Sequence, residues 1–179
     1  AAVVYLHIEK AVEPSWMIYS VLGLIYREIG SLEPSLAYYD KALEGSDPPM
    51  ELHHDRGVVL FKMGRFEEAG TEFKSMLDTD PSNPMVWNNL GSAQEAQGND
   101  GGAVLSYMKA LEEDGNYFPA LYSMGRILQK QGRMEEAGVF MEKALELEGK
   151  VFDLNDVSSR ESRESGGGLH IKEVMTKKD

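Results

Sequence analysis

Adjacent histidines, His53 and His54, have the clearest capacity for chemistry in this chain, because imidazoles ligate metals and exchange protons near neutral pH. On a helix, neighbouring side chains project about 100° apart, so the pair does not present both rings to one metal ion in good geometry. The other two histidines, His7 and His170, stand far away in the sequence. We therefore expect partly exposed helical histidines, with no metal site and no cofactor.

Paired carboxylates are a second candidate, because two carboxyl groups can share acid and base work. The pairs Glu67-Glu68 and Glu135-Glu136 stand where helices are expected to begin, and carboxylates stabilise that end of a helix dipole. GNDGG at 98–102 resembles a phosphate-binding loop only in its glycine content. No zinc-protease, serine-hydrolase or nucleotide-binding motif occurs. The sequence predicts no catalytic residue and a protein that is not an enzyme.

The charge and composition of the chain exclude some classes of binding partner. The net charge is −12, and residues 150–179 hold six basic and six acidic residues, so the acidic excess lies in residues 1–149. Such a body repels nucleic acid and anionic lipid, and no apolar run is long enough for membrane insertion. The absence of cysteine fits a reducing compartment, and the first residues lack the basic start of a signal peptide. We expect a cytoplasmic protein, processed or cut from a longer chain because no initiator methionine is present.

Any functional site must be positioned by secondary-structure elements, and in this chain these elements are set by an internal sequence repeat. Two glycine series recur at steps of 34 residues. Alanines and large apolar residues recur between them at the same step, with no insertion. In the third unit, apolar spacing predicts helices over 84–96 and 100–113, separated by a stop at Gly98. Small residues, Gly91 and Ala103, fall where the two helices must approach closely. The glycines are Gly23, Gly57, Gly91 and Gly125, and Gly30, Gly64, Gly98 and Gly132.

These units resemble tetratricopeptide repeats. The third unit carries that family's pattern at Trp87, Leu90, Gly91, Ala103, Tyr107 and Ala110, and the second carries it at Gly57, Gly64, Ala69, Phe73 and Pro81. The resemblance implies an all-α fold, a right-handed α-solenoid of tandem helix-turn-helix units of 34 residues. Several positions depart from the pattern: His53 and Arg56 replace apolar residues, Gln94 an aromatic residue, and Ser35 and Met76 alanines.

The domain organisation follows from this register. Four units are expected at 16–49, 50–83, 84–117 and 118–149, preceded by the second helix of a truncated repeat at 1–15. The period fails after Gly149, so 150–179 is expected to be a flexible tail. Its segment 156–168 has linker composition, with a phosphorylated regulatory segment as the alternative, and LHIKEVMTKK could form a short terminal element.

The resemblance also implies a site, because the first helices of such arrays line a concave groove that binds peptide segments of partners. The two-carboxylate clamp for chaperone tails is disfavoured, since lysine and asparagine are missing at its positions. Val21, Leu24 and Val58 make one end of the groove apolar, and the other end is polar to basic, which suits a ligand with an apolar segment followed by an acidic or polar one. By register, the groove residues are His54, Asp55, Asn88, Asn89, Ser92, Tyr122, Ser123, Arg126 and Lys130.

Two functions remain open from the sequence. The first is a non-catalytic adaptor that binds a protein or peptide segment in the groove, with the Asn88 and Asn89 amides holding its backbone. The second is a self-assembling scaffold, or a repeat segment appended to a catalytic domain of a larger protein. Self-association through uncapped repeat ends would follow from the apolar surface that such ends expose.

Overall fold

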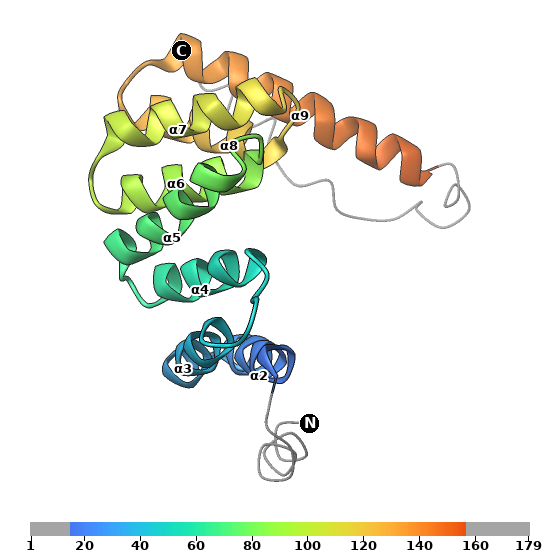
Figure 1. Cartoon of the computed structure of the whole chain (residues 1–179). Helices are drawn as coiled ribbons and strands as arrows, with labels where there is room; N and C mark the ends of the chain where they lie inside the picture. Colours follow the sequence, from blue (N-terminus) through green and yellow to red (C-terminus); the bar gives the residue numbers. More distant parts are fainter. Residues whose placement is uncertain (1–14, 157–179) are drawn as a thin grey trace. The chain divides into compact units, whose positions relative to one another are not determined.

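The computed structural model describes residues 15–156, and all regular secondary structure in this range is helical. Consecutive helices pack against each other as hairpins, and each hairpin contacts the next (Figure 1). The expected all-α array of tandem helical hairpins is confirmed. The helices are α2 (Trp16–Glu28), α3 (Leu32–Leu43), α4 (Glu51–Lys62), α5 (Phe66–Thr79), α6 (Pro84–Ala96), α7 (Asp100–Glu113), α8 (Phe118–Lys130) and α9 (Met134–Asp156).

The chain divides into two compact units, with the boundary after Ala144. The first unit contains the helical hairpins, and the described part of the second is the remainder of α9, which continues beyond residue 149, where the fourth repeat was expected to end. The predictions for residues 1–14 and 157–179 lie outside the described residues. Between residues 15 and 156, no helix is long and apolar enough to cross a membrane.

Glycine ends the first helix of every hairpin. Gly30, Gly64, Gly98 and Gly132 have φ between 78° and 79°, the left-handed conformation that glycine adopts without steric cost. The residue after each glycine donates a backbone hydrogen bond to the carbonyl five residues earlier, as Asn99 does to Gln94 at 2.9 Å. This pattern closes the helix end and turns the chain into the second helix. At the opposite end of α6, the Asn83 side chain accepts hydrogen bonds from the Met85 and Val86 amides, and Pro84 occupies the first turn.

The other glycine series lets the paired helices approach closely. A Cβ atom added to Gly91 would lie 2.6 Å from Cε1 of Tyr107, and one added to Gly57 would lie 2.7 Å from Cε1 of Phe73. Gly23 faces Tyr39 in the same way, and Gly125 faces Met141. Each hairpin therefore places a large side chain in the space that a missing Cβ leaves free. The close crossing expected at Gly91 is confirmed.

In the second unit, His53 and Arg56 replace the apolar residues of the repeat pattern. Their side chains form a polar network with neighbouring helices. Arg56 of α4 donates to Asp40 of α3 at 2.7 Å and also pairs with Glu72 of α5. His53 donates to the same Glu72 at 2.7 Å. Burial acts to lower the pKa of Arg56, but the two carboxylates outweigh it and raise that pKa. The network thus joins three helices at a position where most repeats use apolar side chains.

A buried tyrosine gives the first testable prediction. Tyr39 is fully buried, and its hydroxyl has no hydrogen-bond partner in the described structure. Replacing Tyr39 with phenylalanine removes an unsatisfied polar atom, so the free energy of unfolding at neutral pH should stay unchanged or rise by up to about 1 kcal/mol. Urea unfolding of Tyr39→Phe and wild type measures the difference.

The same substitution should change the response to alkali. Burial, with a contribution from Asp55, raises the pKa of Tyr39 from 10.0 to about 12. Below pH 10 the hydroxyl is protonated in both states; above it the unfolded chain ionises first, so stability is lost as the pH rises towards about 12. Tyr39→Phe should lose less stability over this window. An equal loss in both proteins would contradict the assignment.

Candidate ligand-binding face

The predicted groove residues lie on the first helices of their hairpins, α4, α6 and α8. We call this surface, together with the matching side of α2, the first-helix face. Side chains link α2 to α4, α4 to α6, and α6 to α8 across it. Neighbouring first helices therefore form one continuous surface in the first unit.

Asp55 and His54 join α4 to its two neighbours. Asp55 accepts a hydrogen bond from Arg27 of α2 at 2.9 Å. Burial acts to raise the pKa of Asp55, but His54 and Arg27 outweigh it and hold that pKa below its usual value. On the other side, the Asn89 amide of α6 donates to His54 Nε2 at 3.0 Å. The adjacent histidines therefore form hydrogen bonds with different helices, because His53 donates to Glu72 of α5.

Arg126 of α8 forms an ion pair with Glu95 of this chain. Its guanidinium donates to both oxygens of Glu95 of α6, at 2.7 and 2.5 Å. The Glu95 side chain is only 10% exposed and also accepts a hydrogen bond from the Tyr107 hydroxyl at 2.9 Å. Lys130 likewise donates to Asp100 at 2.8 Å. The basic end expected for the groove is thus already neutralised, and an acidic ligand segment has no unpaired Arg126 or Lys130 to bind.

Two of the predicted polar residues are buried. Asn88 is 8% exposed and Ser123 is 9% exposed, so neither offers its side chain as the open surface that the register indicated. Ser92 is partly buried and donates to the Asn88 backbone carbonyl at 3.0 Å. Tyr122 is 51% exposed and stacks on Phe118, with ring centroids 6.5 Å apart. Of the asparagine pair, only Asn89 reaches the surface as expected.

The apolar end expected for the groove is present. Val21 and Leu24 on α2 are exposed, and Val58 on α4 is partly buried. Val58 lines a depression of about 290 Å³ between α4 and α6, which we call the apolar pocket. Aromatic side chains from α4 and α5 give it apolar walls, and Asn89 and Ser92 supply polar groups. Its lining residues are Val58, Phe61, Lys62, Phe73, Asn89 and Ser92.

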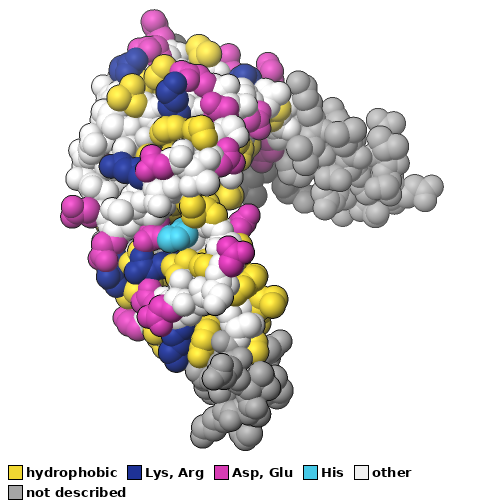
Figure 2. Space-filling model, viewed as in Figure 1, with side chains coloured by type: hydrophobic (Ala, Val, Ile, Leu, Met, Phe, Trp, Pro, Cys, Tyr) yellow, Lys and Arg dark blue, Asp and Glu magenta, His cyan; other side chains and the backbone are white. Residues whose placement is uncertain are grey.

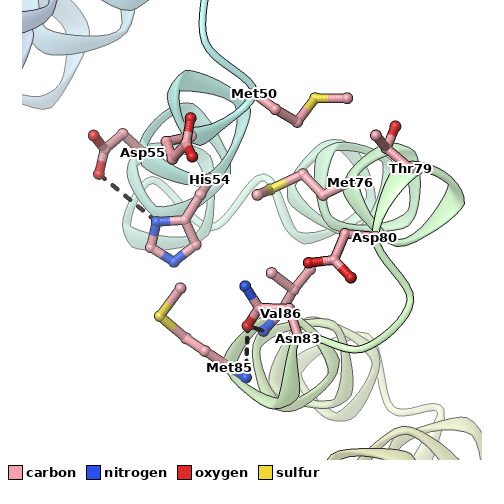
Figure 3. Close-up of a pocket in the computed structure, with 10 residues that line it drawn as sticks. Met50, His54, Asp55, Met76, Thr79, Asp80, Asn83, Met85 and Val86 are labelled. Atoms are coloured by element: carbon pink, nitrogen blue, oxygen red, sulfur yellow. Dashed lines mark hydrogen bonds and ion pairs between the residues drawn. The ribbon is translucent and has the colours of Figure 1, made fainter.

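A second depression, of about 260 Å³, lies at the other end of α4, and we call it the acidic pocket (Figure 3). His54 lines it, so the Asn89–His54 hydrogen bond joins a lining residue of the apolar pocket to a lining residue of the acidic pocket. In Figure 3, Met76 of α5 and Met85 of α6 point towards the His54 ring. The lining residues are Met50, Glu51, His54, Asp55, Met76, Thr79, Asp80, Asn83, Met85 and Val86.

Sequence reasoning missed the pocket residues that do not come from first helices. Phe73 and Met76 belong to α5, and Asp80 follows that helix directly. One signal was present: Met76 occupies a position where Ala42, Ala110 and Ala144 stand in the other units. A larger residue at one unit of a regular array marks a place where the packing differs. Among the side chains of residues 15–149, no group of three or more His, Asp or Glu is placed to hold a metal ion.

Comparison with known proteins agrees with this geometry. The sequence pattern of the tetratricopeptide repeat family matches residues 54–118, and a second form of that pattern matches 18–44 and 118–150. A TPR repeat-containing protein of Pseudomonas aeruginosa is 31% identical over 82% of this chain and 56% of its own length. DnaJ homolog subfamily C member 3 of Bos taurus is 27% identical over 64% of this chain, and human tetratricopeptide repeat protein 7B is 29% identical over 50%. The chain spans 24% and 11% of those two relatives.

Solved structures share the fold at lower identity. A crystal structure of MamA superposes with a TM-score of 0.76 at 20% identity, covering 85% of this chain and 89% of that one. MamA from Desulfovibrio magneticus RS-1 gives a TM-score of 0.70 at 17% identity, covering 76% and 77%.

Tandem hairpins whose left-handed glycine turns recur every 34 residues, from Gly30 to Gly132, define an α-solenoid. The chain belongs to the tetratricopeptide repeat family, whose arrays are protein–protein interaction modules.

Proposed function

We propose that the first-helix face over α4 and α6 binds an extended segment of a partner protein, and that this chain acts as a non-catalytic adaptor. The apolar pocket carries the proposal. It combines the partly buried apolar side chains of Val58 and Phe61 with polar groups from Asn89 and Ser92. Apolar walls with a few placed polar groups are the usual composition of a binding site.

Asn89 is suited to hold a peptide backbone. Its amide nitrogen is oriented by the hydrogen bond to His54, and no hydrogen bond from the described residues reaches its carbonyl oxygen. That oxygen can accept a hydrogen bond from a backbone N–H of a segment in the groove, whatever the sequence of the segment. An apolar side chain of the same segment would then enter the pocket beside Val58.

Selection from a random-sequence peptide library displayed on phage tests the proposal. Peptides enriched on the wild-type chain should lose at least tenfold in affinity on Val58→Glu, because a charge would replace an apolar wall. Asn89→Ala should weaken binding by about 1–3 kcal/mol, the cost of leaving a polar partner unpaired. Fluorescence anisotropy of the labelled peptides gives the dissociation constants.

The control is Lys109→Ala, an exposed change on the second helix α7. It should leave peptide affinity unchanged, and all three variants should keep wild-type helicity by circular dichroism. Failure to enrich any peptide above an uncoated surface would overturn the proposal. So would peptides whose binding responds equally to Lys109→Ala and Val58→Glu.

A further inference from the structure

We infer that the acidic pocket receives a lysine or arginine side chain of the segment that binds in the neighbouring apolar pocket. This inference rests on the proposed function and adds the chemistry of the partner. Asn89 of the apolar pocket donates a hydrogen bond to His54 of the acidic pocket, so the two pockets are neighbours and a single extended segment can reach both. A basic residue near an apolar residue is therefore the recognition pattern that the surface favours.

The walls of the acidic pocket suit the stem of a long basic side chain. Met50, Met76, Met85 and Val86 contribute apolar surface from three different elements. Methionine side chains are flexible and polarizable, so they adapt to an inserted chain. Lysine and arginine commonly bury their methylene stems along apolar surface while the charged head stays near polar groups.

The charges around the pocket suit the head of such a side chain. Its lining contains three carboxylates, Glu51, Asp55 and Asp80, and neither lysine nor arginine. Arg27 compensates Asp55 from outside the lining. Among the described residues, no ion pair involves Glu51.

Hydrogen bonds from Ser82 both keep the Asp80 carboxylate charged and hold it in position at the pocket. Its Oδ1 accepts hydrogen bonds from the Ser82 amide at 3.0 Å and the Ser82 hydroxyl at 2.6 Å. These bonds lower the pKa of Asp80, and they fix the carboxylate at the turn between α5 and α6. No hydrogen bond from the described residues reaches Oδ2, which is left to accept one from a ligand.

The surface around the pocket strengthens the attraction. Over residues 15–149 the sequence has 11 basic and 22 acidic residues. Acidic side chains are spread over the face shown in Figure 2, with hydrophobic patches between them. A field of this sign raises the association rate of basic segments and is screened by salt.

The enriched peptides from the library selection decide the inference. They should carry a lysine or arginine at a constant distance from an apolar residue. Changing that basic residue to methionine, or combining Glu51→Gln with Asp80→Asn in the protein, should reduce affinity at least fivefold at low salt. Library selection on the charge-reversed variant Glu51→Lys/Asp80→Lys should enrich acidic residues at the same position. Glu113→Gln, a single-charge change in the last turn of α7, is the control and should leave affinity within twofold.

The outcomes separate the two proposals. Peptides that depend on Val58 but lack a basic residue would overturn the inference and leave the proposed function standing. The inference would also fail alone if Glu51→Gln/Asp80→Asn bound the basic peptides as tightly as the wild type does. If Val58→Glu has no effect on any peptide, or none is enriched, both proposals fail together. Thermal unfolding of each variant shows that the fold is retained.

Discussion

Replacing Gly91 with leucine should lower the free energy of unfolding by about 3 kcal/mol or more. A Cβ alone at this position would lie 2.6 Å from the Tyr107 ring, and leucine adds three further carbons. The ring cannot yield cheaply, because Tyr107 is fully buried and its hydroxyl donates to Glu95 at 2.9 Å. The two helices of the third hairpin must therefore separate. Urea unfolding monitored by circular dichroism measures the loss.

Gly101 supplies the matched control. It lies on α7, the partner helix of the same hairpin, and a Cβ added there would meet no atom within 4 Å. Gly101→Ala should stabilise the protein by about 0.4–1 kcal/mol, because alanine restricts the unfolded chain and favours the helix. If Gly91→Leu unfolded at the wild-type urea concentration, the crossing would have to be looser than the structure shows.

Replacing Arg126 with alanine should cost about 1–3 kcal/mol of folding stability. The substitution removes two hydrogen bonds from Glu95 and leaves that mostly buried carboxylate with the Tyr107 hydroxyl as its donor. This expected loss of stability is smaller than for a fully buried ion pair, because the Arg126 side chain is 47% exposed. The repeat register placed Arg126 among the groove residues, and its contacts with Glu95 also give it a structural role.

Arg133 provides the comparison, because it also pairs with a glutamate through two guanidinium nitrogens. Its partner Glu136 lies three residues away on the surface of the same segment, so Arg133→Ala should change the melting temperature very little. A double change of Arg126→Ala with Glu95→Gln should recover part of the loss, because no uncompensated charge remains. Equal effects of Arg126→Ala and Arg133→Ala would show that the Glu95 pair does not connect α6 to α8.

The ends of the helices could be predicted almost to the residue. For the site, the sequence predicted which helices carry it but not which of their side chains are accessible to a ligand. Helices expected at 84–96 and 100–113 are observed as α6 and α7 with the same ends. Two local features fix these ends: Gly98 stops α6, and the Asn99 side chain caps α7 by accepting a hydrogen bond from the Gly102 amide. Burial on the first-helix face depends on neighbours from other units. His54, Asn88 and Tyr122 are equivalent in the repeat, yet they are partly buried, buried and exposed in turn.

The partners of the charged groove residues were hidden for the same reason. Arg126 pairs with a residue 31 positions earlier and Lys130 with one 30 positions earlier. Neither separation equals the 34-residue step, because long side chains reach across to a different level of the neighbouring helix. The repeat pattern places backbones, and side-chain reach then decides which polar groups remain available to a ligand.

Each glycine turn lies inside its own unit, so an in-frame loss or gain of one unit would leave every remaining turn intact. The side-chain links between neighbouring units would not survive such a change. Deletion of residues 50–83 would bring Asn89, the repeat equivalent of Asp55, to the position opposite Arg27, and would remove His54 together with most of the acidic pocket. In terms of gene rearrangement, the array can lose or gain a unit and keep its remaining turns, but its side-chain links require a fixed order of units, and this shortened chain would leave Arg27 without its carboxylate partner.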